Sequence, residues 1–393
     1  MTLRTLDELG DVAGRRVFVR ADFNVPLQGG AVADDMRIRA TLPTIEQLLQ
    51  RGATLALASH LGRPKGQVRD DLRLAPVAAR LSELLVRPVT ALAETAPHGI
   101  PDDPVVLLEN LRFDPGEEAN DVTFAGRLAE LADAYVDDAF GASHRAHASV
   151  SALPELMRAS GRAAVAGRLL QREVDVLSTL LHDPARPYVA ILGGAKVSDK
   201  LATINALVER VDVLLIGGAM AFTLIAADGG AIGDSLVEPD RFDEVRAATA
   251  RASERGVRIV LPTDIVAAVD NSAQAERRTV PADEIPSGWK GLDIGPQTIE
   301  TFERTIADAK TILRNGPMGV FETEPFAGGT NAVALAVAGS SAFSVVGGGD
   351  SLLAVKRAGL EDAFDHLSTG GGASLEFLEG RALPGITILE DPT

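Results

Sequence analysis

Short apolar runs alternate with amphipathic helical patterns from one end of the chain to the other. In the first half, the apolar runs predict strands at residues 16–20, 53–58, 104–108 and 134–137. In the second half, they predict strands at residues 188–192, 211–216, 257–261, 311–314 and 343–346. Strands that alternate with helices are typical of parallel sheets covered by helices on both faces. The pattern therefore predicts an α/β fold.

A long helical pattern at about residues 165–182 separates the two groups of strands. The sequence HDPARP (182–187) interrupts this pattern just before the second group begins, and proline is a strong helix breaker. We therefore predict a first domain of residues 1–165, a linker helix at 166–182 and a second domain of residues 183–375.

One stretch, residues 326–349, carries no charge over 24 residues and is long enough to cross a membrane as a helix. Its glycines and serines divide it into a helix at about 329–339 and a strand at 343–346. We therefore expect both pieces to be buried in the second domain, and no membrane association.

The composition narrows the possible partners. The 393 residues include 38 cationic and 55 acidic ones, so the formal net charge is −17. This charge argues against a general nucleic-acid or anionic-membrane binder, because both need a broad basic surface. The chain has no cysteine, which excludes disulfides and thiol nucleophiles and fits a reducing compartment. The polar start MTLRTLDELG shows no secretory signal.

The segments that follow the strands differ between the two halves. The first-half segments are rich in arginine and histidine: DFN (22–24), SHLGRPKG (59–66), ENLRF (109–113) and DDAFGASHRAH (137–147). The second-half segments are rich in glycine: GGAK (193–196), IGGAMAF (216–222), NGPMGVFE (315–322), GGGDS (347–351) and STGGGAS (368–374).

Ligands of parallel sheets bind beyond the carboxyl ends of the strands. Converging arginines and histidines suit a small, multiply charged anion, because guanidinium groups bind phosphate and carboxylate with two hydrogen bonds. Glycine-rich turns let the backbone approach the phosphates and ring of a nucleotide closely. An anion site and a nucleotide site in one chain indicate phosphoryl transfer.

The stretch YVAILGGAKVSDK (188–200) contains two of the six lysines in the chain, Lys196 and Lys200. We expect them on one face of a helix start, with the helical pattern running from Ser198 to Glu209. The stretch is not a Walker A loop, which requires G-x-x-x-x-G-K-[ST]. The alternative interpretation is two solvated lysines on a helix.

The motifs RADFNVP, DDMRIRATLPTI, SHLGRPKG, LLENLRF, DDAFGASHRAHAS, LGGAKVSDK, NGPMGVFE, GGGDS and STGGGASLEFLEG occur in this order along the whole chain. In these motifs the chain resembles the phosphoglycerate kinase family. The resemblance implies reversible, magnesium-dependent phosphoryl transfer between 1,3-bisphosphoglycerate and ADP, giving 3-phosphoglycerate and ATP, in glycolysis and gluconeogenesis. It also implies two Rossmann-like lobes that close on each other and a C-terminal segment, 376–393, that returns to the first domain.

The resemblance also implies roles for individual residues. It places the triose acid on Asp22, Asn24, Arg37, His60, Arg63, Arg112 and Arg145. It places the nucleotide on Lys200, Gly291, Glu322, Gly347, Gly348, Gly349, Asp350 and Ser351, with Glu322 on the ribose and Asp350 bearing the Mg²⁺. It places the migrating phosphoryl group among Arg37, Lys196 and the N–H groups of Gly371 and Gly372.

The sequence departs from the family's pattern at Ala21, Asp137, Ala219, Asp234 and Ser351. In the family we associate valine, asparagine, glycine, lysine and threonine, respectively, with these positions. Ser351 keeps a hydroxyl group, and Ala219 adds one methyl group near the expected adenine pocket. We expect this methyl group to reduce nucleotide affinity without abolishing it.

Two other functional classes fit parts of the pattern. A dinucleotide-dependent dehydrogenase would need G-x-G-x-x-G after the first strand and an acidic residue about twenty positions later, and no glycine turn has this spacing. A non-enzymatic nucleotide-binding protein of this fold would be expected to lack Lys196 or Arg37, and both are present. We therefore expect a cytoplasmic, monomeric kinase that binds small molecules and no nucleic acid.

Overall fold

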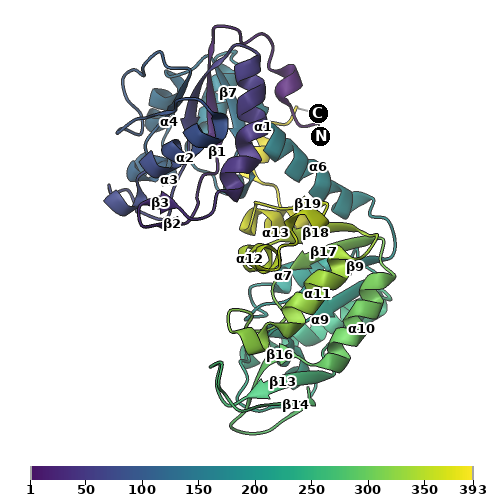
Figure 1. The fold of residues 1–393 in the computed structure, drawn as a ribbon. Coiled ribbons are helices and arrows are strands. Elements are labelled where there is room, and N and C mark those ends of the chain that lie inside the picture. The colour runs from purple at the N-terminus through teal and green to yellow at the C-terminus, as the bar shows by residue number, and fades with distance from the viewer. Residues whose placement is uncertain (1, 392–393) are drawn as a thin grey trace. The chain divides into compact units, whose positions relative to one another are not determined.

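The computed structural model of the chain describes residues 2–391 and divides into two compact units. The first unit runs up to Asp175 and includes the segment from Ala382 onward, and the second unit comprises Val176–Arg381. Each unit contains a sheet of parallel strands with helices packed against it (Figure 1). The chain passes from one unit to the other within helix α6 (Arg168–His182). The predicted α/β class with parallel sheets is confirmed.

The sheet of the first unit has the strand order β5-β6-β4-β1-β7-β8, and all neighbouring strands are parallel. These strands are β1 (Arg16–Ala21), β4 (Thr54–Ala58), β5 (Thr90–Ala91), β6 (Val105–Leu107), β7 (Ala134–Asp138) and β8 (Ala164–Ala166). A small antiparallel hairpin is formed by β2 (Leu27–Gln28) and β3 (Ala31–Val32).

The helices of the first unit cover this sheet, because their apolar faces pack on the buried strand residues. They are α1 (Met36–Gln50), α2 (Ala75–Leu85), α3 (Pro115–Glu118), α4 (Val122–Ala129), α5 (Ala152–Ala159) and α14 (Pro384–Thr387). Ile45 of α1 and Leu81 of α2 are fully buried against Val19 and Leu57. The central strands are thus buried on both faces, as continuous apolar runs predict.

The sheet of the second unit has the order β12-β10-β9-β17-β18-β19, again with parallel neighbours. Its strands are β9 (Tyr188–Leu192), β10 (Val213–Ile216), β12 (Arg258–Val260), β17 (Thr311–Asn315), β18 (Phe343–Gly347) and β19 (His366–Leu367). Two smaller sheets pair β11 (Ala231–Ile232) with β15 (Glu284–Ile285), and β13 (Asp264–Ala268) with β14 (Arg277–Pro281) and β16 (Lys290–Ile294).

The helices of the second unit follow its strands in the βαβ manner. They are α7 (Leu201–Val208), α8 (Met220–Ala227), α9 (Phe242–Glu254), α10 (Pro296–Ala307), α11 (Gly328–Ala338), α12 (Gly349–Arg357) and α13 (Gly372–Leu378). Helices α10 and α11 lie side by side (Figure 1), and their residues Phe302 and Val333 are buried against Ile191 and Leu215.

Each predicted strand matches an observed strand with ends that differ by at most two residues. Two helix predictions begin too early. Helix α6 begins at Arg168 rather than at 166, because Ala166 is the last residue of β8 and pairs with β7. Helix α7 begins at Leu201 rather than Ser198, so Lys196 and Lys200 precede the helix. The strands β5, β8 and β19 are too short for an apolar run to reveal them.

The C-terminal segment from Ala382 packs on the first unit. The Gly385 N–H donates to the Ser143 carbonyl (2.9 Å), and the Arg4 N–H donates to the Leu389 carbonyl (3.1 Å). Helix α13 lies in the second unit, although the predicted returning segment, which begins at 376, includes part of it.

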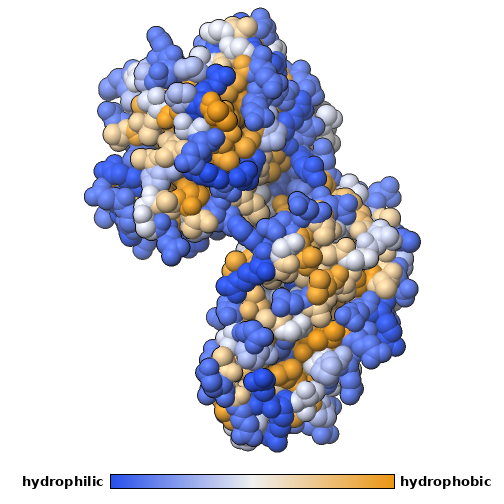
Figure 2. Space-filling model, in the orientation of Figure 1, coloured by the Kyte–Doolittle hydropathy of each residue, from blue (hydrophilic) through white to orange (hydrophobic). Residues whose placement is uncertain are grey.

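Hydrophilic residues dominate the visible surface of the molecule, and apolar residues form smaller patches among them (Figure 2). No helix within residues 2–391 is both long enough and apolar enough to cross a membrane. The uncharged stretch 326–349 folds as helix α11 and strand β18, in which Val333, Val337 and Val346 are buried.

Candidate functional site

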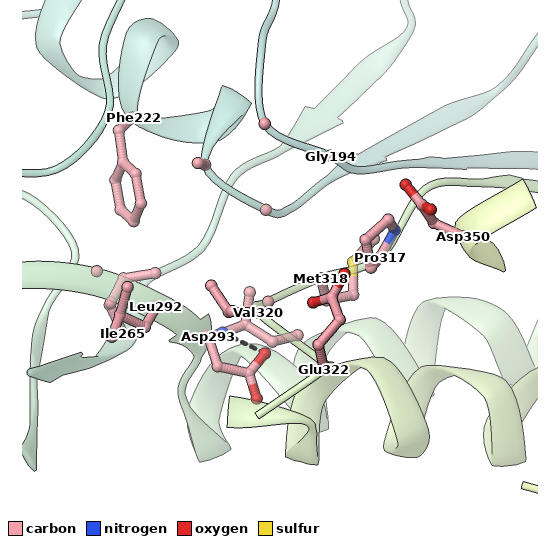
Figure 3. A pocket seen from close by; sticks show the side chains of 16 residues that line it. Gly194, Phe222, Ile265, Leu292, Asp293, Pro317, Met318, Val320, Glu322 and Asp350 are labelled. Atoms are coloured by element: carbon pink, nitrogen blue, oxygen red, sulfur yellow. Dashed lines mark hydrogen bonds between the residues drawn. The ribbon is translucent and has the colours of Figure 1, made fainter. Parts of the chain in front are cut away.

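A pocket opens in the second unit where β16 and the segments that follow β9, β10 and β17 come together (Figure 3). One end of this pocket is apolar, with Phe222 and Ile265 in its wall, and Asp350 lies at the other end. The Glu322 side chain lies between the two ends and is exposed. The pocket is lined by Gly194, Ala195, Gly218, Ala219, Phe222, Ile265, Gly291, Leu292, Asp293, Ile294, Pro317, Met318, Gly319, Val320, Glu322 and Asp350.

Close packing explains why Gly291 belongs to this wall. A Cβ atom at Gly291 would lie 2.1 Å from Cζ of Phe222, so any larger residue would displace the ring. Ala219, one of the departures from the family pattern, also lines the pocket and packs on the small cluster that contains Phe222. The apolar end thus has the shape and chemistry that suit a flat, weakly polar ring.

A second cavity adjoins the first and shares Asp350 with it. Its lining combines glycine-rich turns with two cations, Lys196 and Lys200. The cavity is lined by Gly193, Gly194, Ala195, Lys196, Asp199, Lys200, Asn315, Gly316, Pro317, Gly348, Gly349, Asp350, Ser351, Gly371, Gly372 and Leu375. Exposed backbone N–H groups beside ammonium groups are suited to bind phosphates. Gly347, the last residue of β18, lines neither cavity.

The two lysines are held differently. Lys200 is half-buried, its ammonium group donates to Oδ1 of Asn315, and burial lowers its pKa. Lys196 is exposed in the turn before α7. This turn is fixed by the Glu238 carboxylate, which accepts the backbone N–H (2.9 Å) and the hydroxyl (2.6 Å) of Ser198. The lysines therefore reach one cavity without lying on a helix face.

The turn between β18 and α12 presents Asp350 and Ser351 in different ways. Asp350 is exposed in the first turn of α12. Ser351 is fully buried, and its Oγ accepts the N–H of Gly316 at 2.6 Å, which joins the start of α12 to the turn after β17. Ser351 therefore positions this turn, while the Asp350 carboxylate is open to a ligand.

The single carboxylate of Asp350 is the kind of ligand expected for a magnesium ion that is bound mainly by the phosphates of a nucleotide. Within residues 2–391, no three His, Cys, Asp or Glu side chains are placed to hold a metal ion together. Mg²⁺ in phosphate-transfer sites is usually held by one or two carboxylates together with substrate phosphates and water. A single exposed carboxylate in the lining of a cavity that also contains glycine turns and two lysines fits that pattern.

In the first unit, the segments after the strands carry charged and polar side chains that contact one another. The Arg37 guanidinium pairs with the Asp22 carboxylate at 2.8 Å, and Asp22 is almost completely buried. Oδ1 of Asn24 accepts the Gly62 N–H at 2.9 Å, so the Asn24 amide NH₂ remains available for a ligand.

His60 lies deepest in this cluster. Burial, together with the charges of Arg20 and Arg112, keeps the pKa of His60 well below its ordinary value. Nη2 of Arg20 is 3.1 Å from Nδ1 of His60, and because arginine only donates, Nδ1 accepts and Nε2 carries the proton. His60 is therefore a neutral donor in this site.

The remaining arginines differ in how they are held. Nη1 of Arg112 donates to the Gly62 carbonyl at 2.8 Å, and its Nε lies 3.4 Å from Glu118. Arg63 and Arg145 are exposed, and their side chains make no ion pair within the described part of the chain. Burial, together with the charges of Arg112, Arg20 and Arg145, lowers the pKa of His147 to about 4.

Several residues of these sites were not identified from the sequence. In the second unit they include Asn315, Phe222 and the apolar wall of the first pocket. In the first unit they include Arg20, which is fully buried and donates from Nε to Ser149 Oγ (2.8 Å), and Asn110. The two asparagines lie within two residues of the ends of predicted strands, so the rule that located the other residues could have found them.

Comparisons with known proteins show which family the chain belongs to. The family model described as phosphoglycerate kinase matches residues 6–381. A phosphoglycerate kinase of Rubrobacter xylanophilus is 53% identical over 397 residues, covering 100% of this chain and 99% of the relative. One of Roseiflexus castenholzii is 50% identical over 400 residues, with 100% of both chains covered.

Solved structures agree as well. Phosphoglycerate kinase from Coxiella burnetii matches with a TM-score of 0.89 and 41% identity over 99% of both chains. The enzyme from Pyrococcus horikoshii matches with a TM-score of 0.85 and 30% identity, covering 99% of this chain and 98% of that one. The chain therefore belongs to the phosphoglycerate kinase family, and it is a phosphotransferase that interconverts 1,3-bisphosphoglycerate and ADP with 3-phosphoglycerate and ATP.

Proposed function

We propose that the two adjoining cavities of the second unit bind the nucleotide in a single orientation. The ring lies at the apolar end against Gly291, the ribose hydroxyls bind Glu322, and the phosphates lie beside Lys200, Gly348, Gly349 and Asp350. The observation that carries this proposal is the order of the lining, which runs from an apolar end through a carboxylate to glycine turns and lysines. Gly347 and Ser351 support the turn on which Asp350 lies.

The triose acid binds in the first unit, on the residues that follow its strands. Arg63, Arg112 and Arg145 bind its phosphate and carboxylate oxygens, His60 donates from Nε2, and the Asn24 amide donates to a hydroxyl or phosphate oxygen. The buried Asp22 holds Arg37 in place with an ion pair of 2.8 Å. A cluster of guanidinium groups next to a neutral histidine suits a ligand with several negative charges.

The chemistry needs positioning and charge neutralisation. The acceptor in the direction of ATP consumption is a carboxylate, which has no proton to lose, so no general base is required. The transferring phosphoryl group spreads negative charge over its oxygens. Lys196 and the N–H groups of Gly371 and Gly372 neutralise this charge from the second unit, and Arg37 does so from the first unit.

When bound, Mg²⁺ supplies additional positive charge to the nucleotide phosphates. We place it on the Asp350 carboxylate, which is exposed at the edge of both cavities. The role of the chain there is to fix one oxygen ligand and leave the other positions to phosphates and water.

We further propose that the enzyme works as a monomer in the cytoplasm and binds no nucleic acid. The net charge of −17 supports the last point, because nucleic-acid binding requires a broad basic surface. The activity itself uses small, soluble substrates, which supports a cytoplasmic location.

Substitution of the two lysines tests the division of roles. Lys196→Ala is expected to lower kcat by about 100-fold or more with a change in MgADP affinity below about twofold, because Lys196 acts mainly on the transition state. Lys200→Ala is expected to weaken MgADP binding by about tenfold as well, because Lys200 is anchored toward the phosphate cavity by Asn315. Isothermal titration calorimetry and a coupled assay measure both quantities.

Lys310→Ala is the matched control. Lys310 is exposed and immediately precedes β17, at the end of the strand opposite the cavities, so its removal is expected to change neither quantity. If Lys196→Ala loses as much MgADP affinity as Lys200→Ala, the two lysines have the same role and the proposed division is wrong.

A further inference from the structure

Asn110 is a fully buried residue three positions after the end of β6, and it uses every hydrogen-bonding group of its side chain. Its Oδ1 accepts the backbone N–H of Leu61 at 3.1 Å and that of Arg112 at 3.2 Å. Its Nδ2 donates to the carbonyl of Leu61 at 2.8 Å and to that of Leu72 at 2.9 Å. The partners fix the orientation of the amide, because a carbonyl only accepts and a backbone N–H only donates.

Three of these bonds join Asn110 to segments far away in sequence, at Leu61 and Leu72, and the fourth lies within the turn that contains Asn110 and Arg112. Leu61 lies between His60 and Arg63, in the loop that follows β4, and Arg112 lies in the turn that follows β6. Leu72 belongs to the segment that leads into α2. One buried side chain therefore sets the backbone of two segments that carry three of the proposed triose-acid ligands.

The neighbouring residues complete the same arrangement. Gly62, which has a φ of +62°, donates its N–H to Asn24, and its carbonyl accepts from Nη1 of Arg112 at 2.8 Å. A Cβ atom there would lie 2.8 Å from Cδ2 of Leu72, so the loop also packs closely on that segment. Glu109, just before Asn110, accepts the Leu74 N–H at 2.9 Å.

We propose that Asn110 is a positioning residue for the triose-acid site, which holds the His60–Arg63 loop and the Arg112 turn in their ligand-binding geometry without contacting the ligand. The proposal rests on the proposed assignment of His60, Arg63 and Arg112 to the triose acid. All four of its hydrogen bonds are already made within the protein, so nothing in the amide is left for a ligand. Aspartate has the same shape, but it would place a carboxylate against two carbonyl oxygens.

The test compares Asn110→Ala with Leu81→Ala, a core substitution on α2 in the same unit. The two variants are compared under conditions in which they have lost similar thermal stability. Asn110→Ala is then expected to raise the KM for 3-phosphoglycerate by about tenfold or more, because part of the substrate's binding energy must be used to order the two ligand-carrying segments. The KM for MgATP is expected to stay within about twofold. Leu81→Ala is expected to leave both KM values within about twofold of the unmodified enzyme. Equal effects of the two variants on the KM for 3-phosphoglycerate would overturn the proposal.

Arg112→Ala separates this proposal from the site assignment on which it rests. If Arg112→Ala leaves the KM for 3-phosphoglycerate unchanged, the assignment of the triose-acid site fails. If Arg112→Ala raises this KM and Asn110→Ala does not, only the role of Asn110 fails. Asn110→Ser, which replaces the amide with a shorter hydroxyl group that can make only some of the four hydrogen bonds, is expected to give an intermediate KM.

Hydrogen exchange gives a test that does not depend on a variant folding. In the unliganded enzyme, the N–H groups of Leu61 and Arg112 are expected to exchange as slowly as those of the adjacent strands β4 and β6, because the Asn110 side chain already binds them. Rapid exchange of both groups until 3-phosphoglycerate is added would show that the ligand orders the segments, and would contradict the proposal.

Discussion

Asp137 is a carboxylate in a place that disfavours charge. It is completely buried in β7, its Oδ1 accepts the Ala139 N–H at 2.9 Å, and its Oδ2 has no hydrogen-bond partner among the described residues. Burial raises its pKa from 3.8 to about 7. The resemblance to the family puts asparagine at this position, so the chain carries an ionisable group where a neutral amide of the same shape would suffice.

Asp137→Asn is expected to stabilise the protein, and more at high pH than at low pH. The folded-state pKa lies above the unfolded one, so between pH 4 and pH 7 the unfolded state binds fewer protons and the aspartate loses stability as the pH rises. Asparagine removes this loss. The gain in free energy of unfolding is expected to be larger at pH 8 than at pH 5 by about 2 kcal/mol.

Urea unfolding of both proteins at pH 5 and pH 8 measures this difference. Asp102→Asn is the control, because the Asp102 side chain is fully exposed and its neutralisation is expected to give little pH dependence. A gain from Asp137→Asn that is equal at both pH values would show that Asp137 is ionised in the folded protein throughout this range.

At the scale of single residues, the sequence predicted best where chemistry and strand ends coincide. Lys196, Lys200 and Asp350 were predicted to share a site because a cation or carboxylate follows a buried strand and a glycine turn, and the structure places all three in the lining of one cavity. Residues whose role depends on distant partners were not found. Arg314 lies in β17 and is fully buried, and its Nε and Nη1 have no hydrogen-bond partner among the described residues. Nothing in the structure explains why an arginine occupies this position.

At the scale of elements, the turn between β18 and α12 is set by Gly348. Its φ of 90° and ψ of 136° belong to a region that only glycine adopts readily. A Cβ atom there would lie 3.1 Å from Nδ2 of Asn315, the residue whose Oδ1 accepts from Lys200. The turn and the lysine are thus coupled through one asparagine.

Gly348→Ala is expected to destabilise the protein by about 1–3 kcal/mol because of this backbone conformation. It is also expected to weaken MgADP binding, since the new methyl group displaces Asn315. Gly349→Ala is the matched control for stability: Gly349 begins α12 without a positive φ, and a Cβ atom there would meet no neighbouring atom within 4 Å. Thermal unfolding and calorimetry measure both effects, and equal destabilisation by the two substitutions would refute the backbone argument.

Element boundaries show why a periodic pattern predicts the existence of an element better than its ends. The helical spacing of 198–209 is real, but the first residues are held in a turn by Glu238, which lies 40 positions away from Ser198. Similarly, Ala166 fits a helical pattern but belongs to strand β8, because it pairs with Asp137 of β7. Both boundaries depend on tertiary contacts, which local spacing does not record.

At the scale of the whole molecule, the proposed ligands divide between the two units. Arg37, His60 and Arg112 belong to the first unit, and Lys196 and Asp350 belong to the second. The family reaction nevertheless joins the two ligands, because a phosphoryl group passes directly from one to the other. In-line transfer requires the reacting atoms to lie about 3–3.5 Å apart.

The units are therefore expected to draw together most when both reactants are bound. In the proposed sites, each ligand alone contacts residues of one unit. Only when both ligands are bound can they make contacts in the closed state that are missing in the open state. Small-angle scattering of the unliganded enzyme, both binary complexes and the ternary complex with a non-reacting ATP analogue measures this. The radius of gyration is expected to be smallest in the ternary complex. With Arg112→Ala at the same ligand concentrations, the decrease is expected to be lost, because the triose acid no longer binds well. A radius of gyration that is identical in all four states of the unmodified enzyme would show that transfer does not depend on closure.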